Sequence, residues 1–368
     1  MYDSNYTQQI LNTDYRMKSI AIIGGGIAGL EAAAKLSGMG YAVTIVEKSD
    51  RLGGRLNQWH ALFPARKPSG PLLARLKSRV AEGVNLVVNA DTTGIEKNDD
   101  GFAIKINNNR MITADALLLT TGFDIFEAER KEEYGYGIYE NVITSVDLEQ
   151  IFQSGKPLLT TQGKIPSRIG FIHCVGSRDE KVGNLHCSKV CCVTAVKQAI
   201  EVKEMLPSAE VFLFYMDLRM FGRHFEELYK EAQFRHGIQF IRARLSEAFE
   251  NPDCSIQIRI EDTLLAKPLK MNLDMLVLMV GIQPQKKAGN LVDMLGLERD
   301  ADGFLMQEDQ YTAPFKTKIP GLYCAGGITG PKTIEESLTE ARAVAAEINT
   351  FLKHKESYAG HEQFVIEL

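Results

Sequence analysis

A glycine-rich turn near the start of the chain leaves few choices for the fold that follows it. The short apolar run Ser19–Ile23 is typical of a buried parallel strand, and an Ala-rich segment ending near Gly38 predicts a helix. Between them lies Gly24-Gly25-Gly26-Ile27-Ala28-Gly29, and a second apolar strand is predicted at Tyr41–Val46. The chain therefore begins with a βαβ unit whose glycines occupy the first strand-to-helix turn.

This turn has the residue spacing of a dinucleotide-binding loop. Gly24 permits a tight turn, Gly26 lets the backbone approach a pyrophosphate, and Gly29 lets the helix pack on the strand. The helix N-terminus favours the anionic phosphates, and Glu47, at the end of the second strand, can accept hydrogen bonds from a ribose. We therefore expect this part of the site to consist of Gly24, Gly26, Ala28, Gly29, Glu47 and Lys48.

The rest of the chain predicts a second α/β unit. At 368 residues the chain is longer than one hydrophobic core usually supports. Strand and helix patterns alternate again from Ile169, with a helix from about Ser188 to Met205 and a later strand at Leu273–Val280. The stretch 124–166 is polar and interrupted by glycines, so we place a domain crossing there. The expected organisation is an N-terminal arm at 1–17, a discontinuous first domain at 18–125 and 272–368, and an inserted α/β domain at 126–271.

Composition and charge exclude several classes of protein. A net charge of −5 gives no support for nucleic-acid binding. No apolar run reaches the roughly eighteen residues that a membrane-spanning helix needs. The start of the chain lacks the basic-then-apolar pattern of an export signal. We therefore expect a cytoplasmic protein without an integral membrane segment.

Four of the six cysteines gather in one segment, as Cys174, Cys187, Cys191 and Cys192. The adjacent pair makes a poor disulfide, because neighbouring Cα atoms lie only about 3.8 Å apart. Clustered thiols in a reducing compartment indicate metal or redox chemistry, and iron–sulfur clusters take thiolates in sets of four. We expect these four cysteines to be metal ligands, most simply of a [4Fe-4S] cluster. Cys254 and Cys324 stand alone and predict small buried side chains.

The cysteine segment leaves other interpretations open. A structural zinc site would normally use two spaced cysteine pairs, and a thiol–disulfide centre would normally show a C-x-x-C motif. Four inert buried thiols are a further alternative. Ser188 is expected to cap the helix that follows, whose N-terminus would stabilise a negatively charged cluster. His173 and His186 flank the segment, and we expect them to pack or to form hydrogen bonds rather than to bind metal.

Three further segments resemble those of two-dinucleotide-binding flavoproteins with a thioredoxin-reductase-like fold. They are Leu52-Gly53-Gly54-Arg55, Leu118-Leu119-Thr120-Thr121-Gly122 and Gly321-Leu322-Tyr323-Cys324-Ala325-Gly326-Gly327. The resemblance implies that the first domain binds FAD and adds Gly54, Arg55, Thr121, Gly122, Gly326 and Gly327 to its site. Gly327 replaces the usual aspartate of the family. The glycine fingerprint for NAD(P)H is missing after the strand Ile169–Cys174, so we do not expect that cofactor in the inserted domain.

The middle of the chain resembles the flavoprotein (A-type) component of heterodisulfide reductase. The resemblance rests on Phe171-Ile-His-Cys174-Val-Gly-Ser-Arg178-Asp179, His186-Cys187-Ser-Lys-Val-Cys191-Cys192, Tyr215-Met216-Asp217-Leu-Arg219-Met-Phe221-Gly222 and Gly330-Pro331-Lys332. It implies a [4Fe-4S] cluster on the four cysteines, close to FAD. Extra cluster motifs of the C-x2-C-x2-C-x3-C type are missing, so the chain is similar to the short form found in heterodisulfide-reductase-like complexes of sulfur oxidisers.

This resemblance implies an oxidoreductase that relays electrons between FAD and the cluster, with partners resembling the B and C subunits of heterodisulfide reductase. From the size of the chain we also expect a homodimer or docking in a larger complex. We expect Lys197 to act as a catalytic group beside the flavin, the alternative being an ordinary solvated helix lysine. Lys332 and Thr333, at the start of the last helix, are expected to approach the flavin or its phosphates. Two other functions stay open: a stand-alone NAD(P)H-dependent disulfide or sulfide oxidoreductase, and a non-catalytic FAD-fold subunit used for assembly.

Overall fold

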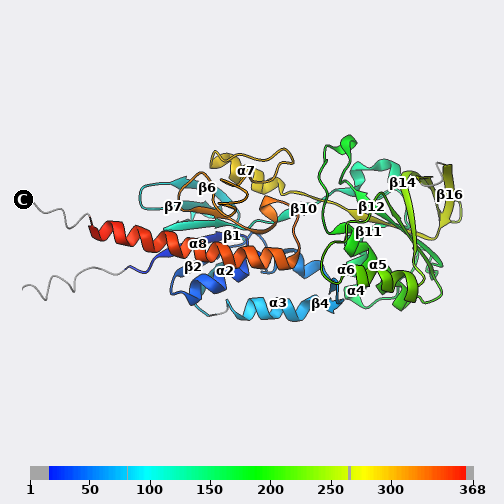
Figure 1. The fold of residues 1–368 in the computed structure, drawn as a ribbon, viewed down its shortest axis with the longest axis horizontal. Coiled ribbons are helices and arrows are strands. Elements are labelled where there is room, and N and C mark those ends of the chain that lie inside the picture. Colours follow the sequence, from blue (N-terminus) through cyan, green and yellow to red (C-terminus); the bar gives the residue numbers. More distant parts are fainter. Residues whose placement is uncertain (1–15, 81, 264–266, 362–368) are drawn as a thin grey trace, which may run out of the picture.

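The computed structural model describes residues 16–80, 82–263 and 267–361, and it divides into two α/β units that lie side by side along the long axis of the molecule (Figure 1). Each unit is built on its own parallel sheet. The expected N-terminal arm falls almost entirely outside the described residues.

The first unit contains a five-stranded parallel sheet in the order β19-β9-β1-β2-β5. Its strands alternate in sequence with helices, which forces right-handed crossovers and leaves the central strands buried on both faces. The strands are β1 (Ser19–Ile23), β2 (Ala42–Val46), β5 (Val84–Val87), β9 (Ala116–Leu119) and β19 (Leu322–Cys324).

Different layers cover the two faces of this sheet. On one face α2 packs against α8, which runs along the first unit and points away from the second (Figure 1). A three-stranded antiparallel sheet and α7 cover the other face. The elements of these layers are α2 (Ile27–Gly38), α3 (Ser69–Ser78), α7 (Lys286–Met294), α8 (Ile334–His361), β6 (Thr92–Lys97), β7 (Phe102–Ile106) and β8 (Met111–Ala114).

The second unit contains a seven-stranded sheet in the order β11-β17-β12-β13-β14-β15-β16. The first five strands are parallel, and β14 to β16 form an antiparallel meander at one edge. Its strands are β11 (Val142–Thr144), β12 (Arg168–Val175), β13 (Glu210–Tyr215), β14 (Gln239–Glu250), β15 (Ile256–Asp262), β16 (Lys267–Leu273) and β17 (Met275–Val280).

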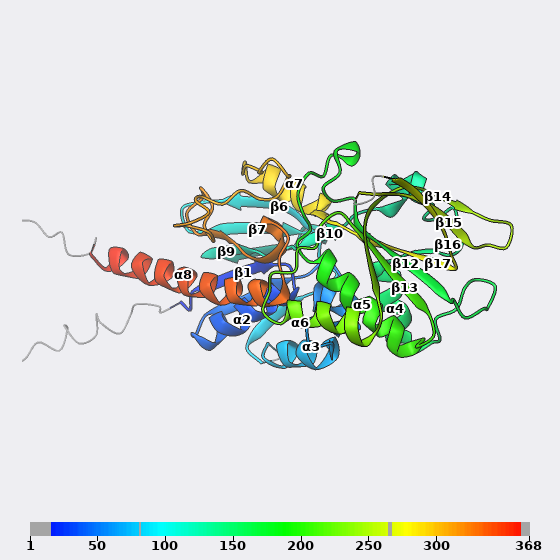
Figure 2. The ribbon, with the colours of Figure 1, turned by 45° about the vertical axis from the view of Figure 1, so that its right-hand side comes forward.

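Three helices of the second unit lie on one side of its sheet, as Figures 1 and 2 both show. They are α4 (Ser145–Ser154), α5 (Cys191–Met205) and α6 (Phe225–Lys230), which continues into the π-helical turn η6 (Glu231–Arg235). Helix α5 is the most deeply buried of them and packs on β12, β13 and β17. It therefore provides a rigid support for the side chains along it.

Two antiparallel strands mark where the chain passes between the units. These are β10 (Phe123–Ile125) and β18 (Ile282–Pro284), which pair with one another. The short hairpin of β3 (Ala61–Leu62) and β4 (Lys67–Pro68) also reaches the second unit, because Arg66 donates hydrogen bonds to Glu231. The remaining elements are the 3-10 helices η1 (Gly54–Gln58), η2 (Asn107–Asn109), η3 (Ala128–Arg130), η4 (Glu132–Tyr134), η5 (Glu180–Val182) and η7 (Gly326–Thr329).

The predicted fold class is confirmed, but two details are wrong, the second domain boundary and the Ser188 cap. The second domain boundary falls after Val280 rather than before residue 272, because β17 pairs with β11 and β12. The stretch 124–166, in which we place a domain crossing, also contains β11 and helix α4. Ser188 does not cap α5, which begins at Cys191 without a side-chain cap; the Ser188 hydroxyl accepts the N–H of Ile282 at 2.7 Å instead.

Within the described ranges, no helix combines the length and the apolar character needed to cross a bilayer.

Candidate functional site

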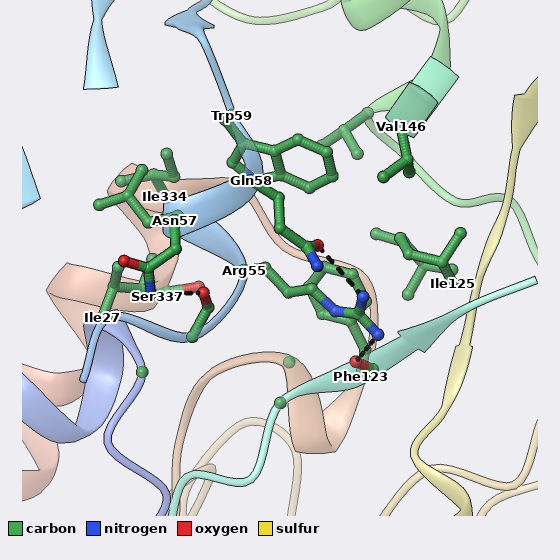
Figure 3. A pocket seen from close by; sticks show the side chains of 18 of the residues that line it. Ile27, Arg55, Asn57, Gln58, Trp59, Phe123, Ile125, Val146, Ile334 and Ser337 are labelled. Carbon is green, nitrogen blue, oxygen red and sulfur yellow. Dashed lines mark hydrogen bonds between the residues drawn. The ribbon is translucent and has the colours of Figure 1, made fainter. Parts of the chain in front are cut away.

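A cavity of about 530 Å³ lies where the glycine turn of the first unit faces helices α4 and α5 of the second. Figure 3 shows side chains from both units pointing into it, among them Trp59 and Phe123 from the first unit and Val146 from the second. A cleft between two α/β units at the ends of parallel strands is where dinucleotides and their substrates normally bind.

The glycine turn lines one side of this cavity, and its glycines are needed for different structural reasons. Gly24 has φ of +108°, and a Cβ there would lie 2.4 Å from the carbonyl oxygen of Thr120. A Cβ on Gly29 would lie 2.0 Å from the carbonyl oxygen of Gly24. A Cβ on Gly26, by contrast, would meet no protein atom within 4 Å. The first two glycines are therefore required by packing, whereas Gly26 leaves space for a ligand.

Glu47 holds the turn from the end of β2. Its carboxylate accepts the N–H of Gly25 at 2.7 Å through Oε2 and the N–H of Ser49 at 2.9 Å through Oε1. The side chain is buried and lies on the cavity wall. Each carboxylate oxygen has more than one lone pair, so the group still has acceptor capacity for a ribose.

Arg55 is the principal cation on the wall near β10. Its guanidinium donates to Gln58 Oε1 at 3.2 Å (Figure 3). It also lies 3.3 Å from an oxygen of Asp124. Burial lowers the pKa of Arg55, with Asp124 opposing that effect. The guanidinium remains charged and is fixed in one orientation, so it can recognise a polar edge of a ligand.

Two buried polar atoms on the wall have no hydrogen-bond partner among the described residues. They are Thr121 Oγ1 and Gln198 Oε1. The amide nitrogen of Gln198 donates to the Ser145 carbonyl at 2.8 Å and to Glu149 at 2.7 Å, so its oxygen is the free end. Unpaired buried polar atoms are costly, and their presence on this wall fits a ligand that supplies the missing partners.

The structure brings most of the predicted cofactor residues to this cavity. Gly29 and Gly326 are the two that do not reach the wall. Gly29 packs on Gly24, and the N–H of Gly326 donates to Glu340 at 2.8 Å. Those that line it are Gly24, Gly26, Ala28, Glu47, Lys48, Gly54, Arg55, Thr121, Gly122, Gly327, Lys332 and Thr333.

The cysteine segment follows the central strand of the second sheet. The pairing of β12 with β17 is irregular between Ile172 and Val175, and Cys174 lies there with φ of +60°. A non-glycine residue in this conformation is strained, so the surrounding structure must hold it. The bulge turns Cys174 toward the start of α5, where Cys191 and Cys192 are buried beside it.

These three thiols interact directly. Contact with the Cys191 thiol, helped by the His173 ring, lowers the pKa of Cys192 to about 4 and also lowers the pKa of Cys174. The same contacts raise the pKa of Cys191. Two of the thiols are thus biased toward thiolate, which is the form that binds metals. Cys191 also lines the cavity.

The fourth cysteine does not complete a ligand set. Cys187 lies in the loop before α5, is partly exposed, and accepts the N–H of Lys189 at 3.3 Å. Over residues 16–80, 82–263 and 267–361, no three His, Cys, Asp or Glu side chains converge on a metal position. The donor set is chemically suited to an iron–sulfur cluster, but the structure does not show the closed arrangement.

The two remaining cysteines and the two histidines near the cysteine segment differ in burial and in hydrogen bonding. Burial raises the pKa of Cys324 to about 12, as expected for an inert core thiol, whereas Cys254 is only half-buried, in a turn. His186 hydrogen-bonds the Ile282 carbonyl oxygen at 2.7 Å, while both ring nitrogens of the buried His173 lack hydrogen-bond partners in the described part of the chain.

Lys197 lies on the cavity wall with only 2% of its side chain exposed, so the alternative of a solvated lysine is wrong. Its ammonium group pairs with the carboxylate of Glu149, which sequence reasoning missed. Glu149 is carried by α4, and α4 begins with a capping box between Thr144 and Asp147. That pattern, a threonine followed three residues later by an acid, is the signal that would have located the helix.

The chain belongs to the pyridine nucleotide-disulphide oxidoreductase family, whose model matches residues 3–147 and 193–345. The unmatched part between these ranges contains all four clustered cysteines. The segment that departs from the family pattern is therefore the one that carries the thiols. The prediction of an oxidoreductase is confirmed at this level.

The chain is also similar to A subunits of heterodisulfide reductases. The chain is 32% identical to the A subunit of the H(2):CoB-CoM heterodisulfide,ferredoxin reductase of Methanothermobacter marburgensis, over 88% of this chain and 62% of that protein. It is also 32% identical to the iron-sulfur A subunit of the CoB--CoM heterodisulfide reductase of Methanocaldococcus jannaschii, over 93% of this chain and 65% of that protein. The chain therefore spans less than two thirds of the length of these relatives.

Solved structures agree on the fold. The thioredoxin reductase of Lactococcus lactis matches with a TM-score of 0.66 and 18% identity, over 92% of this chain and 99% of that one. The thioredoxin reductase of T. acidophilum matches with a TM-score of 0.64 and 18% identity, over 90% of this chain and 98% of that one. At this identity the likeness establishes the thioredoxin-reductase-like architecture alone.

Proposed function

We propose that this chain is an electron-transfer subunit that holds FAD in the cavity and a [4Fe-4S] cluster on Cys174, Cys187, Cys191 and Cys192. The position of Cys191 carries the proposal. Its thiol contacts those of Cys174 and Cys192, and the same residue lines the cavity that contains the glycine turn. A cluster held there would lie beside the dinucleotide site, and electron transfer requires that closeness.

Three features of the cavity are suited to FAD. Gly26 leaves space where backbone must approach a pyrophosphate, and Glu47 stands at the ribose position. Thr121 and Gln198 present unpaired polar atoms to the ligand. When bound, FAD exchanges electrons singly or in pairs, and an iron–sulfur cluster exchanges them singly. This chain's own contribution includes a buried ion pair, Lys197 with Glu149, on the wall that faces the ligand.

The names of the relatives support a second part of the proposal, that the chain works in a complex with other subunits. The matched proteins are A subunits, so we propose partners resembling the B and C subunits. We also propose a homodimeric arrangement. We further propose that the complex acts in the oxidation of sulfur compounds. Cys187 must move inward for four thiols to share one cluster, and its position in a partly exposed loop allows this.

Purification without oxygen tests the proposal. About four irons, matching sulfide and one FAD per chain, with an EPR signal after dithionite reduction, are the expected result. Trp59 is the single tryptophan and lines the cavity, so its fluorescence should be quenched when FAD is added to stripped protein. One zinc per chain, or flavin without iron, would contradict the relay.

A second function is favoured by the family description and by the contact between Cys174 and Cys191. These two thiols could form a redox-active disulfide in an NAD(P)H-dependent reductase. That function predicts a metal-free protein with two oxidisable thiols, whose flavin is bleached by NAD(P)H. Bleaching by dithionite alone, with iron present, supports the relay, and flavin that no reductant bleaches would leave only an assembly role.

A further inference from the structure

Three ionisable side chains are buried together where helices α4 and α5 meet. Lys197 and Glu149 are 2% and 1% exposed in their side chains, and Glu201 is 10% exposed. The Lys197 ammonium pairs with Glu149, lies 3.2 Å from Glu201 and donates to the Ala61 carbonyl at 3.0 Å. We refer to Lys197, Glu149 and Glu201 as the buried trio.

The two carboxylates of the buried trio are supported very unequally. Glu149 accepts the His60 N–H at 2.7 Å through one oxygen and the Gln198 amide at 2.7 Å, besides Lys197, through the other. Neither oxygen of Glu201 accepts a well-directed hydrogen bond from the described residues. Hydrogen bonds stabilise the ionised form of a carboxyl, and Glu149 has such partners whereas Glu201 lacks them.

The balance of charge within the buried trio then determines whether Glu201 is protonated. With both carboxyls ionised, the buried trio would hold two negative charges against one positive charge, and uncompensated buried charge is expensive. One added proton makes the trio neutral. Burial raises the pKa of Glu201 to about 7, Glu149 adds to the rise, and Lys197 and Arg66 oppose it. These groups come from α4, from α5 itself and from the loop between β3 and β4.

The three residues of the buried trio lie at different depths between the cavity and the solvent. Lys197 and Glu149 line the cavity, whereas Glu201 lies one turn further along α5 and does not reach the wall. Beyond Glu201, Arg66 bridges Glu231 and Glu204 at the molecular edge, and Glu204 is half exposed. Glu201 therefore stands between the cavity and the solvent.

We propose that Glu201 stores one proton and supplies it to Lys197 when Lys197 gives a proton to the cavity. An N–H bond of the Lys197 ammonium breaks as its proton moves to an acceptor in the cavity. The O–H bond of Glu201 then breaks to restore the ammonium, and the resulting carboxylate takes a proton from solvent. No electrons pass through these residues. Glu201 acts through Lys197 as a positioning residue, and this role rests on the proposed function, in which a bound flavin takes up the proton on reduction.

Infrared titration of protein stripped of flavin tests the storage step by itself. Wild-type protein should show a protonated carboxyl band that disappears around pH 7. Glu201→Gln should lack the band. Glu204→Gln is the matched control, because it removes an exposed carboxyl of the same helix, and it should keep the band. A wild-type protein without the band, or a band that survives in Glu201→Gln, overturns the proposal.

The transfer step is tested in flavin-loaded protein by following the rate of flavin reduction by dithionite and the accompanying proton uptake with a pH indicator. Glu201→Gln should be slower by roughly ten- to a hundredfold at neutral pH and should lose the midpoint near 7 from its pH profile, while Glu204→Gln keeps both. An unchanged profile in Glu201→Gln overturns the transfer. A protein that binds no flavin defeats the proposed function, and the infrared result still decides whether Glu201 stores a proton.

Discussion

The loops after β1 and after β12 occupy the same place in their two units, yet they differ in length and chemistry. Each follows the central part of a parallel sheet and leads into a helix that packs on it. The first loop is residues 24–26 and is all glycine, whereas the second runs from residue 176 to residue 190 and ends beside two cysteines. The same position in the fold thus carries only glycine in one unit and a cysteine segment in the other.

The placement of the two loops would bring two cofactors close together. Ligands of α/β sheets bind at the carboxyl ends of the strands, and the two sheets present these ends to a shared cavity. A helix N-terminus favours negative charge, whether on phosphate or on a thiolate cluster. The difference lies in the side chains, because glycine admits a ligand to the backbone and cysteine binds one itself.

The largest expected effect separates the two loops. Cys192→Ser should reduce iron from about four atoms per chain to nearly none, because a cluster needs its fourth thiolate, while FAD stays bound in the other loop. Iron and flavin quantification of anaerobic protein measures both. Cys324→Ser changes a buried thiol of β19 away from the segment and serves as the control. Loss of flavin together with iron would show that the two sites cannot be separated.

Substitutions in the first loop should have the reverse effect. Gly26→Ala should weaken FAD binding about 10- to 100-fold, because the added methyl occupies the space that the ligand needs. The free energy of unfolding of stripped protein should change by less than about 1 kcal/mol, since φ at this position is −74°. Quenching of Trp59 fluorescence measures the affinity, and iron content should not change.

Gly29→Ala, in the first turn of α2, tests whether packing and ligand contacts can be told apart. Its methyl would collide with the Gly24 carbonyl oxygen, so the variant should lose about 2–3 kcal/mol of stability even without FAD. Gly38→Ala, at the open end of α2, is the control and should lose none. Equal stability of the Gly26 and Gly29 variants would refute the distinction between a ligand contact and a packing contact.

The buried trio makes a separate prediction, on the pH dependence of stability. Glu201 has a pKa of about 7 in the folded protein and an ordinary value of 4.5 when unfolded, so the folded state holds its proton more tightly. The contribution to stability is complete below pH 4.5 and is lost as the pH rises through 7, by roughly 3 kcal/mol. In Glu201→Gln this loss should be missing. Urea unfolding of stripped protein at pH 4 and pH 8 measures it, and parallel curves for variant and wild type would contradict it.

Sequence reasoning was reliable where function depends on local spacing. Strands β1, β2 and β12 lie where their patterns place them, because apolar runs and glycine spacing act over a few residues. It failed where partners are distant along the chain. The hydroxyl of Ser188 is used by Ile282, 94 residues away, and not by the helix that follows it. Such pairings arise only when two units pack.

Glu149 is the residue of the candidate site that sequence reasoning did not predict. Its importance comes from α4 packing against α5, which brings it to Lys197 across 48 residues of sequence. No local pattern marks a buried carboxylate that pairs with a distant lysine. The helix that carries it was nevertheless visible as the capping box at its start. The backbone of the site was therefore predictable from the sequence, and its charge arrangement was not.

The capping box of α4 supports the smallest prediction, on Thr144. Its side chain accepts the N–H of Asp147 at 3.2 Å, while the Asp147 carboxylate accepts the N–H of Thr144 at 2.8 Å. Thr144→Ala should lower the free energy of unfolding by about 1 kcal/mol through loss of the cap. Thr144→Ser keeps the hydroxyl and should retain most of that stability. Both variants leave the β1 loop untouched, so FAD affinity should be unchanged, and an Ala variant that loses FAD would show that α4 shapes the flavin side of the cavity as well as the buried trio.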